Sequence, residues 1–313
     1  MSRITGNSGI LSKIGLGGAI IIAPLFLSQT VLAAPKDAYL APGGAGNCSS
    51  TSAACATFAE AINYVGKGGT IHVADGSYNQ DITDTTKNQI NIVADNPGSV
   101  NVTLDGPSSW GVYLEGVNDI TISGINFNVS SDNSTVAYAL HAHNARTLTL
   151  QDDKFTGPGK TSEFKTGGVD INSSYNVTET NVSASDFSKN GFSFTSQYNV
   201  GDEISSHVTL TNISATDNEW SGIAFYTTTN TGNSTGHSIH GVTFNGNNSI
   251  TGSGGAAIYF EGTTDATAKE GGKPTFQITG LKDMKVKLGS ISFVSNAFDI
   301  IKPESRINSH LVA

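Results

Sequence analysis

The sequence predicts an all-β solenoid, a parallel β-helix in which short strands stack coil upon coil. Stretches 180–194 and 211–225 are identical at seven of fifteen aligned positions and lie 31 residues apart. After Ile90 the chain consists of short strands separated by turn residues, with no further long helical period. Gly, Asn and Asp also recur at turn positions at a spacing of 28 to 31 residues. A self-match at this period indicates repeated units that bury a core only when stacked.

Residues 1–33 are expected to be a signal peptide. Arg3 and Lys13 precede the apolar run at 14–27, and small residues near Ala33 form a cleavage site. The chain is therefore expected to be secreted or held at the cell surface, with no membrane span after cleavage. An uncleaved membrane anchor is the alternative, although the apolar run is short for a bilayer.

The segment at about 38–70 is expected to cap the first coil, since a terminal coil has no neighbour to cover its apolar face. Cys48 and Cys55 are the only cysteines, and in an exported protein they are expected to form one disulfide. A metal site there would need further ligands that are not nearby. A short helix follows, ended by Gly66, and its apolar face is made of Phe58, Ile62 and Val65.

The coils are expected to occupy about 71–301 of a single domain that spans 34–313, roughly eight coils in all. Turn residues that tolerate a left-handed backbone predict one corner of the coil, at Gly124, Asp152, Asn181, Asn212 and Gly241. Period-two alternation places apolar residues on the inner face. The predicted inner columns are Ile122, Leu150 and Leu210; Ile125, Val182, Ile213 and Val242; and Phe127, Phe155, Ala184, Ala215 and Phe244.

Asp153 breaks this pattern, because it falls where the inner column after the corner otherwise holds aliphatic residues. Either this coil carries a local bulge or a carboxylate is buried and must be paired. We expect the bulge, since an unpaired buried charge costs a large amount of free energy.

Three kinds of segment carry a resemblance to a known family. They are the N-terminal segment YLAPGGAGNCSSTSAACATFAEAINYVGKGGTIHVADGSY, the units NDITISGINF and HVTLTNISATDN, and strands of the Gly-apolar-x-apolar type. With them the chain resembles the right-handed parallel β-helix proteins of the pectin-lyase-like superfamily, over roughly 38–300. The resemblance implies three strands per coil and a substrate groove lined by the strand that follows the long, variable turn. It leaves the activity open, because the superfamily includes lyases, hydrolases, epimerases, adhesins and phage tailspikes.

The groove strands are expected to begin at Val112, Leu140, Val169, Phe192, Ile223 and Ile258. Residues that alternate with the inward positions point outward. The first outward row is Tyr113, His141, Asp170, Ser193, Ala224 and Tyr259. The second outward row is Glu115, His143, Asn172, Thr195, Tyr226 and Glu261. Neighbouring coils lie about 4.8 Å apart, so the titratable residues of the first three coils are expected to form one cluster.

This cluster is typical of β-elimination at a uronate, which needs a base for the C5 proton, an acid for the leaving oxygen and a group that neutralises the carboxylate. A histidine is the candidate base and a tyrosine the candidate acid, while a carboxylate orients the histidine or holds calcium. Hydrolysis would instead use Glu115 and Asp170 as paired carboxylates. The candidate catalytic residues are His141, His143, Asp170, Tyr113 and Glu115.

The groove also offers candidate substrate-binding residues, because aromatic faces stack on sugar rings and amides bond hydroxyl groups. These candidates are Tyr226, Asn172, Tyr259 and Trp110, and Tyr226 is also a second candidate acid. For Trp220, a place in the groove and a place in the core are equal alternatives. For the two histidines, the alternative is a solvated strand face that is polar whatever the protein does.

Net charge limits the partners. A charge of −9 at pH 7 argues against nucleic acid, and an acidic polysaccharide would need a local basic patch or a bridging cation. No metal site is assigned, and calcium is the cofactor that stays open. We predict a monomeric lyase that acts on an acidic polysaccharide. A non-catalytic adhesin or glycan-binding structural protein is the alternative, because the motifs of typical pectate lyases and polygalacturonases are absent.

Overall fold

The computed structural model describes residues 36–83, 87–106, 108–130, 135–196, 204–227, 238–240, 242–262, 269–270, 273–274, 290–294 and 298–301. The predicted signal peptide at 1–33 and the predicted corner residue Gly241 lie outside these ranges. The described residues belong to one compact unit within Pro35–Ala313.

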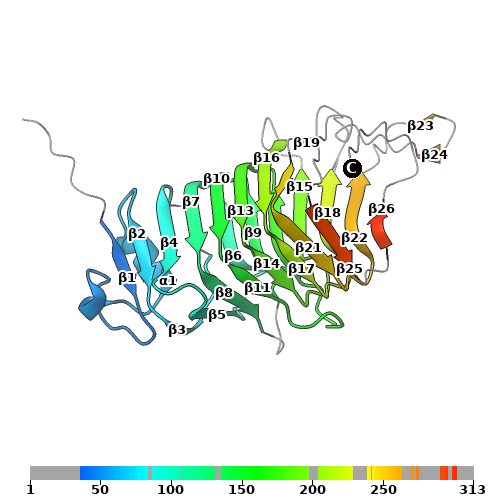
Figure 1. Ribbon diagram of the computed structural model, residues 1–313. Coiled ribbons are helices and arrows are strands. Elements are labelled where there is room, and N and C mark those ends of the chain that lie inside the picture. The colour runs from blue at the N-terminus through cyan, green and yellow to red at the C-terminus, as the bar shows by residue number, and fades with distance from the viewer. Residues whose placement is uncertain are drawn as a thin grey trace, which may run out of the picture. The chain divides into compact units, whose positions relative to one another are not determined.

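Three parallel sheets surround one apolar interior and form a parallel β-helix, as the sequence predicts (Figure 1). Sheet A contains β1 (Ala38–Leu40), β2 (Thr70–Val73), β4 (Ile90–Ala94), β7 (Asn118–Ser123), β10 (Arg146–Gln151), β13 (Tyr175–Thr180), β16 (Ile204–Thr211), β19 (Ser238–His240) and β20 (Thr243–Asn245). Sheet B contains β3 (Gly76–Asn79), β5 (Val100–Leu104), β8 (Ile125–Val129), β11 (Lys154–Thr156), β14 (Ser183–Ser185), β17 (Ser214–Thr216), β21 (Asn247–Thr251) and β25 (Ser290–Val294). Sheet C contains β6 (Trp110–Glu115), β9 (Tyr138–His143), β12 (Gly167–Asn172), β15 (Phe192–Ser196), β18 (Ser221–Thr227), β22 (Ala256–Gly262) and β26 (Phe298–Ile301). A short antiparallel pair is formed by β23 (Lys269–Glu270) and β24 (Lys273–Pro274).

The described residues form fewer complete coils than the eight expected. Six turns have a strand in each of the three sheets, and they run from β4 to β22. Within the described ranges the layers at the two ends are incomplete, because β1, β2 and β3 have no partner strand in sheet C and β25 and β26 have none in sheet A. The prediction divided the chain length by the repeat spacing, so it also counted the partial coils at the ends, whereas a complete turn needs a strand in all three sheets.

Like residues stack in the interior, as period-two alternation predicts. The rings of Phe127 and Phe155 lie one coil apart, with centroids separated by 5.0 Å. Phe194 and Phe225 repeat this arrangement further along the solenoid at 5.3 Å. In these two pairs of neighbouring coils, an aromatic side chain is therefore buried against the equivalent side chain of the next coil, which supports the sheets from within.

The predicted corner is confirmed at four positions. Gly124, Asp152, Asn181 and Asn212 all have positive φ, between 53° and 78°. Asn181 Nδ2 donates a hydrogen bond to Asp152 Oδ1 at 2.7 Å, and Asn212 Nδ2 donates one to Asn181 Oδ1 at 3.0 Å. Short polar side chains suit this column because they tolerate the left-handed backbone and bond to the same corner of the neighbouring coil.

The next corner is Gly246, so the prediction of Gly241 is wrong. β16 pairs with β20 with Thr211 opposite Asn245, which places Gly246 level with Asn212. Gly246 has a φ of +66°, and a Cβ atom there would lie 2.2 Å from Asn212 Oδ1. The spacing from Asn212 is therefore 34 residues (246 minus 212) rather than 29 (241 minus 212).

This shift of register also moves the inner residues of the coil. Phe244 lies opposite Leu210, before the corner, and Ile250 takes the place predicted for Phe244. Asn248 takes the place predicted for Val242, directly after the corner. This repeat is longer than those before it, and a spacing rule taken from the earlier coils cannot locate the additional residues.

The bulge expected at Asp153 is also wrong. The strand register is continuous on both sides of Asp153, and its carboxyl group is buried. Oδ1 accepts a hydrogen bond from Ile125 N at 2.9 Å, and Oδ2 accepts one from Gln151 N at 3.1 Å. Asn248 Oδ1 accepts a bond from Ile213 N in the same way, at 3.0 Å. A polar side chain inside the corner thus satisfies a backbone donor of the preceding coil.

A second carboxyl group, that of Glu179, lies in the interior between Leu150 and Leu210 of the neighbouring coils. Its side chain is 0% exposed, and neither oxygen has a hydrogen-bond partner among the described residues. Burial and, second, the charge of Asp153 raise the pKa of Glu179 to about 8. Burial likewise raises the pKa of Asp153 to about 8, although its bonds to backbone N–H groups lower it. At neutral pH both groups are therefore mostly neutral carboxylic acids.

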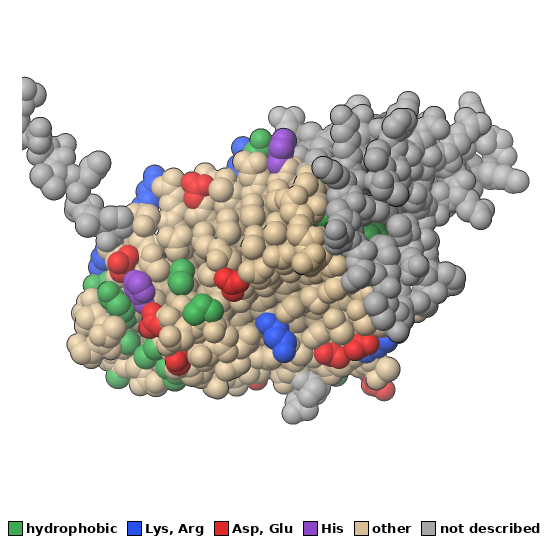
Figure 2. All heavy atoms as spheres, viewed as in Figure 1, with side chains coloured by type: hydrophobic (Ala, Val, Ile, Leu, Met, Phe, Trp, Pro, Cys, Tyr) green, Lys and Arg blue, Asp and Glu red, His purple; other side chains and the backbone are tan. Residues whose placement is uncertain are grey.

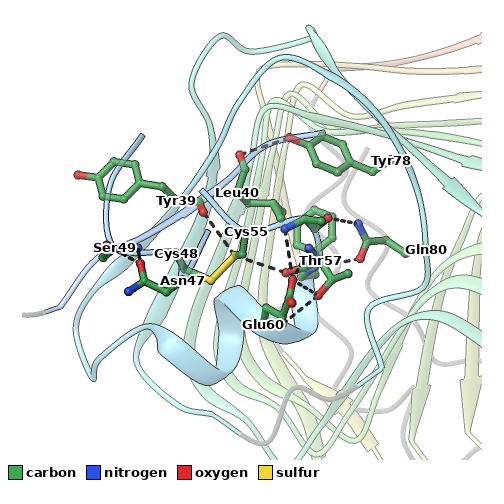
Figure 3. The surroundings of a disulfide bond; sticks show 12 residues. Tyr39, Leu40, Asn47, Cys48, Ser49, Cys55, Thr57, Glu60, Tyr78 and Gln80 are labelled. Atoms are coloured by element: carbon green, nitrogen blue, oxygen red, sulfur yellow. Dashed lines mark hydrogen bonds between the residues drawn. A yellow bond between two sulfur atoms is a disulfide. The ribbon is translucent and has the colours of Figure 1, made fainter. Parts of the chain in front are cut away.

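The N-terminal cap contains the predicted helix and the predicted disulfide. Helix α1 (Phe58–Tyr64) begins with a capping box, in which Thr57 Oγ1 accepts from Glu60 N at 3.2 Å and Glu60 Oε2 accepts from Thr57 N at 3.1 Å. Cys48 and Cys55 form the disulfide and flank the short 3₁₀ helix Thr51–Ala53 (Figure 3). The predicted apolar face is buried against the first strands and comprises Phe58, Ile62 and Val65.

The surface carries few charges. Neutral polar side chains and backbone cover most of the face in Figure 2, where charged side chains are scattered. This distribution matches a chain in which 14% of the residues are charged. Within the described ranges, no helix has the length and apolar character needed to cross a bilayer.

Candidate active site

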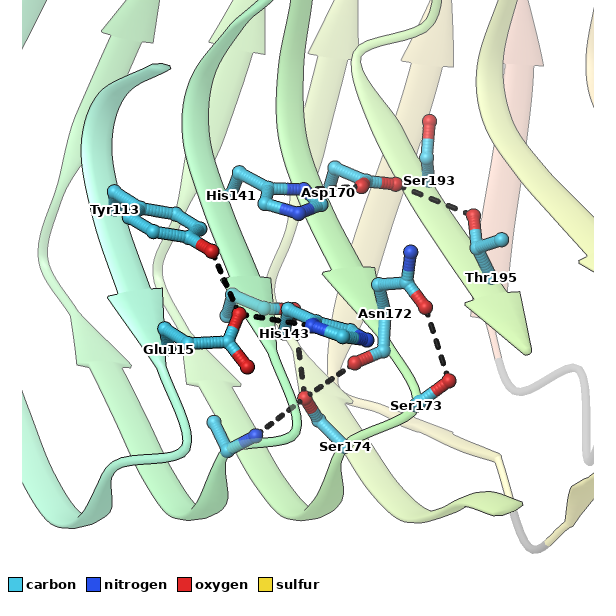
Figure 4. Close-up of polar contacts among 12 residues, drawn as sticks. Tyr113, Glu115, His141, His143, Asp170, Asn172, Ser173, Ser174, Ser193 and Thr195 are labelled. Atoms are coloured by element: carbon cyan, nitrogen blue, oxygen red, sulfur yellow. Dashed lines mark hydrogen bonds and ion pairs between the residues drawn. The ribbon is translucent and has the colours of Figure 1, made fainter. Parts of the chain in front are cut away.

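Sheet C presents the predicted outward rows on three neighbouring coils (Figure 4). Strands β6, β9 and β12 pair in a register that aligns two sets of side chains: Tyr113, His141 and Asp170, and then Glu115, His143 and Asn172. The rows continue on β15 as Ser193 and Thr195. The five predicted catalytic residues therefore lie together on one face of the solenoid, with side chains that alternate with the buried ones.

His141 and Asp170 form the more enclosed of two histidine–carboxylate pairs. His141 Nδ1 lies 2.7 Å from Asp170 Oδ2, and the two residues are 8% and 3% exposed. Thr195 Oγ1 donates a hydrogen bond to the other carboxylate oxygen, Oδ1, at 3.2 Å. The ring of Trp110 stacks on the imidazole with centroids 4.1 Å apart. The imidazole is thus held both by a charged partner and by an aromatic face.

His143, Glu115 and Tyr113 form a more exposed cluster beside the first pair (Figure 4). One oxygen, Glu115 Oε2, accepts the hydroxyl of Tyr113 at 2.7 Å and lies 2.8 Å from His143 Nδ1. Burial and then the hydrogen bond to Glu115 raise the pKa of Tyr113 to about 12. A single carboxylate oxygen thus connects a histidine to a phenol that stays protonated at neutral pH.

The carboxylates set the tautomer of both histidines. In each pair the carboxylate contacts Nδ1, so a neutral ring carries its proton on Nδ1 and its lone pair on Nε2. A neutral imidazole held in this way can accept a proton from a bound molecule at Nε2. This arrangement favours proton abstraction over hydrolysis by two carboxylates, because each carboxylate already binds a histidine.

Three of the predicted substrate-binding residues are aromatic and lie along sheet C. Trp110 stacks beside Tyr138 with ring centroids 6.0 Å apart. The hydroxyl of Tyr226 accepts a hydrogen bond from Asn190 Nδ2 at 2.9 Å, and its ring lies 5.9 Å from that of Tyr259. All three predicted residues are partly exposed.

Asn172, the fourth predicted binding residue, is not an exposed amide. It is 2% exposed, and its Oδ1 accepts a hydrogen bond from Ser173 Oγ at 3.0 Å. His143 and Thr195 flank it in the same row on the two neighbouring coils. Side chains of the two neighbouring coils cover a residue in the middle of a row. Alternation along the sequence predicts that such a residue points outward, but it does not predict that its neighbours bury it.

Lys189 and Tyr138 were not among the predicted site residues, but they lie beside the outward rows of sheet C, where the ring of Tyr138 stacks near those of Trp110 and His141. Lys189 Nζ lies 5.0 Å from the ring centroid of Tyr138 and 6.0 Å from that of Trp220. Gly167 permits this arrangement, because a Cβ atom there would lie 2.5 Å from Tyr138 Cδ1. The ring of Tyr138 therefore lies directly over the next coil. Trp220 is 46% exposed, which excludes the alternative that it packs in the core.

The sequence contained a signal for Lys189. Lys189 and Trp220 occupy the same position in the matching stretches 180–194 and 211–225. Trp220 N donates a hydrogen bond to Lys189 O at 3.2 Å, so the two residues follow one another on adjacent coils. The identical positions of the two stretches mainly hold residues that form corners and core. Lys189 and Trp220 are among the positions that differ between the stretches.

The described residues do not form a calcium site by themselves. Both oxygens of Asp170 and Oε2 of Glu115 already contact protein groups. Within the described ranges there is no group of three or more His, Cys, Asp or Glu side chains placed to hold a metal. Calcium takes about six to eight oxygen ligands, so we derive no step through a metal ion.

No protein-family model matches the sequence, and no curated protein matches it. Among solved structures, a rhamnogalacturonan lyase aligns with a TM-score of 0.55 and 14% identity, over 83% of this chain and 67% of that chain. A pectate lyase aligns with a TM-score of 0.48 and 16% identity, over 85% of this chain and 78% of that chain. The likeness to the rhamnogalacturonan lyase concerns the fold alone, and it confirms a right-handed parallel β-helix.

Proposed function

We propose that this chain is a secreted lyase that cleaves an acidic polysaccharide by β-elimination at a uronate. The observation that carries the proposal is Glu115 Oε2, which binds the Tyr113 hydroxyl at 2.7 Å and His143 Nδ1 at 2.8 Å. Elimination needs a base and an acid that act on one sugar, and a shared carboxylate keeps both in place. The disulfide between Cys48 and Cys55 supports export, since disulfides persist in oxidising compartments.

His143 is the base and Tyr113 the acid of the proposed reaction. His143 Nε2 takes the C5 proton of the uronate, while the N–H group at Nδ1 stays hydrogen-bonded to Glu115. The electron pair of the C5–H bond forms the C4–C5 double bond, and the C4–O bond to the leaving sugar breaks. Tyr113 gives its hydroxyl proton to the leaving oxygen. The imidazolium then releases the Nε2 proton to water and the Tyr113 phenolate takes a proton from water, which restores Tyr113 and a neutral His143 with its proton on Nδ1.

His141 and Asp170 position the sugar rather than exchange the C5 proton. Trp110 covers one face of the imidazole, and His141 is less exposed than His143. The pair therefore forms a fixed surface next to the reacting cluster. Tyr226 is a less favoured acid because it lies two coils beyond Asp170, on the side away from Tyr113 and His143.

The proposal is tested by the ultraviolet absorbance of unsaturated products over pectate, alginate and glycosaminoglycans, with and without calcium. We expect product from at least one of them, and about a 10²- to 10⁴-fold lower kcat for His143→Gln and for Tyr113→Phe. His207→Gln is the matched control, because His207 is an exposed histidine on β16 of sheet A. New reducing ends without unsaturated product would indicate hydrolysis, and unchanged rates in both site variants would refute the assignment.

A glycan-binding protein without turnover is the second candidate. The outward row supports it, because Ser193 and Ala224 follow the titratable residues on the next two coils. This candidate predicts binding on a glycan array with no product from any bound glycan, and an array without a ligand would count against it. In either case we expect a monomer, which light scattering after size exclusion can measure.

A further inference from the structure

Among the described residues, Lys189 differs from Lys160 and Lys165 because no carboxylate forms an ion pair with it. Among the described residues, Lys165 Nζ lies 2.7 Å from Glu219 Oε2, and Lys160 Nζ lies 4.0 Å from Asp217 Oδ1. No carboxylate of the described ranges lies within 4.0 Å of Lys189 Nζ. Its ammonium group therefore remains available to an anionic ligand, while the neighbouring cations are already neutralised.

Two aromatic rings flank this ammonium group. Tyr138 and Trp220 lie 5.0 and 6.0 Å from Nζ, measured to the ring centroids. Tyr138 is fixed by Gly167 beneath it and by Trp110 beside it, whereas Trp220 leaves nearly half of its surface open. An open aromatic face binds the apolar face of a sugar ring, and a cation at its edge binds an acidic substituent of that sugar.

The setting of Lys189 strengthens such a contact. The lysine is half-buried; burial lowers its pKa, and the carboxylate of Asp170 opposes this effect. A partly desolvated ammonium interacts more strongly with a bound carboxylate than a fully hydrated one does. The chain has a net charge of −9, so bulk electrostatics repel acidic polymers and a local cation has to supply the attraction.

We propose that Lys189, held between Tyr138 and Trp220, binds the carboxylate of a uronate residue whose ring stacks on Trp220. This inference rests on the proposed lyase function and adds that the site selects carboxylate-bearing polysaccharides over neutral ones. Trp110 is the first residue of β6, and Trp220 directly precedes β18. These two strands are four strands apart in sheet C, which corresponds to about 19 Å along the solenoid at roughly 4.8 Å per coil. The bound polymer therefore runs across the coils, along the solenoid axis.

Calorimetric titration of the full chain with uronate oligosaccharides tests the inference. The probes are galacturonate and alginate oligomers, each compared with the same oligomer after reduction of its carboxyl groups. Where product forms, the Tyr113→Phe background prevents turnover. We expect the wild type to prefer an acidic oligomer, and Lys189→Met to lower that affinity about tenfold or more without changing affinity for the reduced form.

Matched variants separate the role of Lys189 from bulk charge and exposed aromatic area. Lys165→Met changes the net charge equally and should leave binding unchanged, because Lys165 already pairs with Glu219. Trp220→Ala should weaken binding of both oligomer forms. Tyr175→Ala should weaken neither, since Tyr175 is similarly exposed at 43% but lies in sheet A.

Three outcomes would overturn the inference: no binding of any acidic oligomer, equal affinity for acidic and reduced forms, or wild-type affinity in Lys189→Met. Circular dichroism checks that each variant is folded. If Lys189→Met is not, Lys189→Arg and Lys189→Gln replace it, and loss of acidic preference only in the glutamine variant supports the inference. An acidic preference that depends on Lys189, without unsaturated product, would refute the lyase but retain this binding site. Unsaturated product together with an unchanged preference for acidic oligomers in Lys189→Met would support the lyase but refute this binding site.

Discussion

Asp170 and Glu179 are both buried carboxyl groups, but they lie on opposite faces of the coil wall. Asp170 faces outward from sheet C, where one oxygen contacts His141 Nδ1 and the other accepts a bond from Thr195 Oγ1. Glu179 faces inward from sheet A, and neither of its oxygens has a hydrogen-bond partner among the described residues. Burial alone therefore does not identify a functional carboxylate. The partners of the group, and the side of the wall on which it lies, distinguish the two cases.

The interior and the outer face of sheet C also differ in how a carboxyl group affects the free energy of folding. In the interior, Glu179 and Asp153 must be protonated when the chain folds at neutral pH, which opposes folding. Apolar residues of similar volume are often neutral or stabilising replacements for such groups. On the groove, the same residue type orients a histidine, and its removal is expected to impair the reaction rather than the fold.

Apart from loss of the proposed base His143 and acid Tyr113, the largest effect is expected from Asp170→Asn. An amide cannot hold Nδ1–H of His141 as a carboxylate does, so the ring loses its fixed tautomer and position. We expect about a 10³-fold lower kcat, about 4 kcal/mol, with a melting temperature close to that of the wild type. Steady-state kinetics on the cleaved polysaccharide measures this. Glu179→Gln makes the same chemical change at an equally buried position, and an equal loss of kcat there would erase the contrast.

Glu179→Leu is expected to stabilise the protein. Leucine matches Leu150 and Leu210, the residues that occupy this column on the neighbouring coils. With a pKa of about 8 against an ordinary value of 4.5, the carboxyl group opposes folding at pH 7 by about 3 kcal/mol. Denaturant unfolding should show a gain of that order with unchanged kcat. Glu163→Leu, at an exposed position, should change stability by less than about 0.5 kcal/mol. No gain in Glu179→Leu would refute the stated cost.

Stability is expected to fall as pH rises from about 4 to 8. The folded chain keeps protons on Asp153 and Glu179 up to about pH 8, whereas the unfolded chain releases them near the ordinary values of 3.8 and 4.5. The loss approaches about 1.4 kcal/mol per pH unit for each group. Unfolding curves at pH 5, 6, 7 and 8 measure the slope.

A double variant provides the control for this slope. Asp153→Asn keeps the acceptor for Ile125 N, as Asn248 does for Ile213 N, and combined with Glu179→Leu it removes both titrating groups. The double variant should lose the pH dependence that these groups cause. Wild-type stability that instead rises between pH 5 and 8 would contradict the assignment of the slope to interior carboxyl groups.

The smallest effect is expected from Thr195→Val. Valine keeps the shape of threonine but removes the hydroxyl that donates to Asp170 Oδ1 at 3.2 Å. We expect a loss of about 1 kcal/mol, which is about a fivefold lower kcat, because the bond between His141 and Asp170 remains. Thr209→Val, in an outward position of sheet A, is the control and should retain full kcat. A loss as large as that of Asp170→Asn would show that the hydroxyl and not the carboxylate positions the site.

Much of the groove could be predicted from the sequence because it follows from two local regularities. Side chains alternate along a strand, and the chain returns to the same face after each coil. Counting both along the sequence placed Tyr113, His141 and Asp170 in one row, and the strand register confirms that row. Where a coil changes length, the count fails, as it did when it selected Gly241 in place of Gly246.

The sequence by itself determined the solenoid, its cap, its disulfide and the rows of sheet C, because all of them depend on periodicity and on neighbouring residue types. Only the tertiary structure decided what lies across the coils. It placed Asp153 on the backbone N–H of Ile125, Trp110 on the ring of His141, and Lys189 between two aromatic rings. These contacts join residues about 28 to 51 positions apart, and they exist because stacking brings distant segments close to one another.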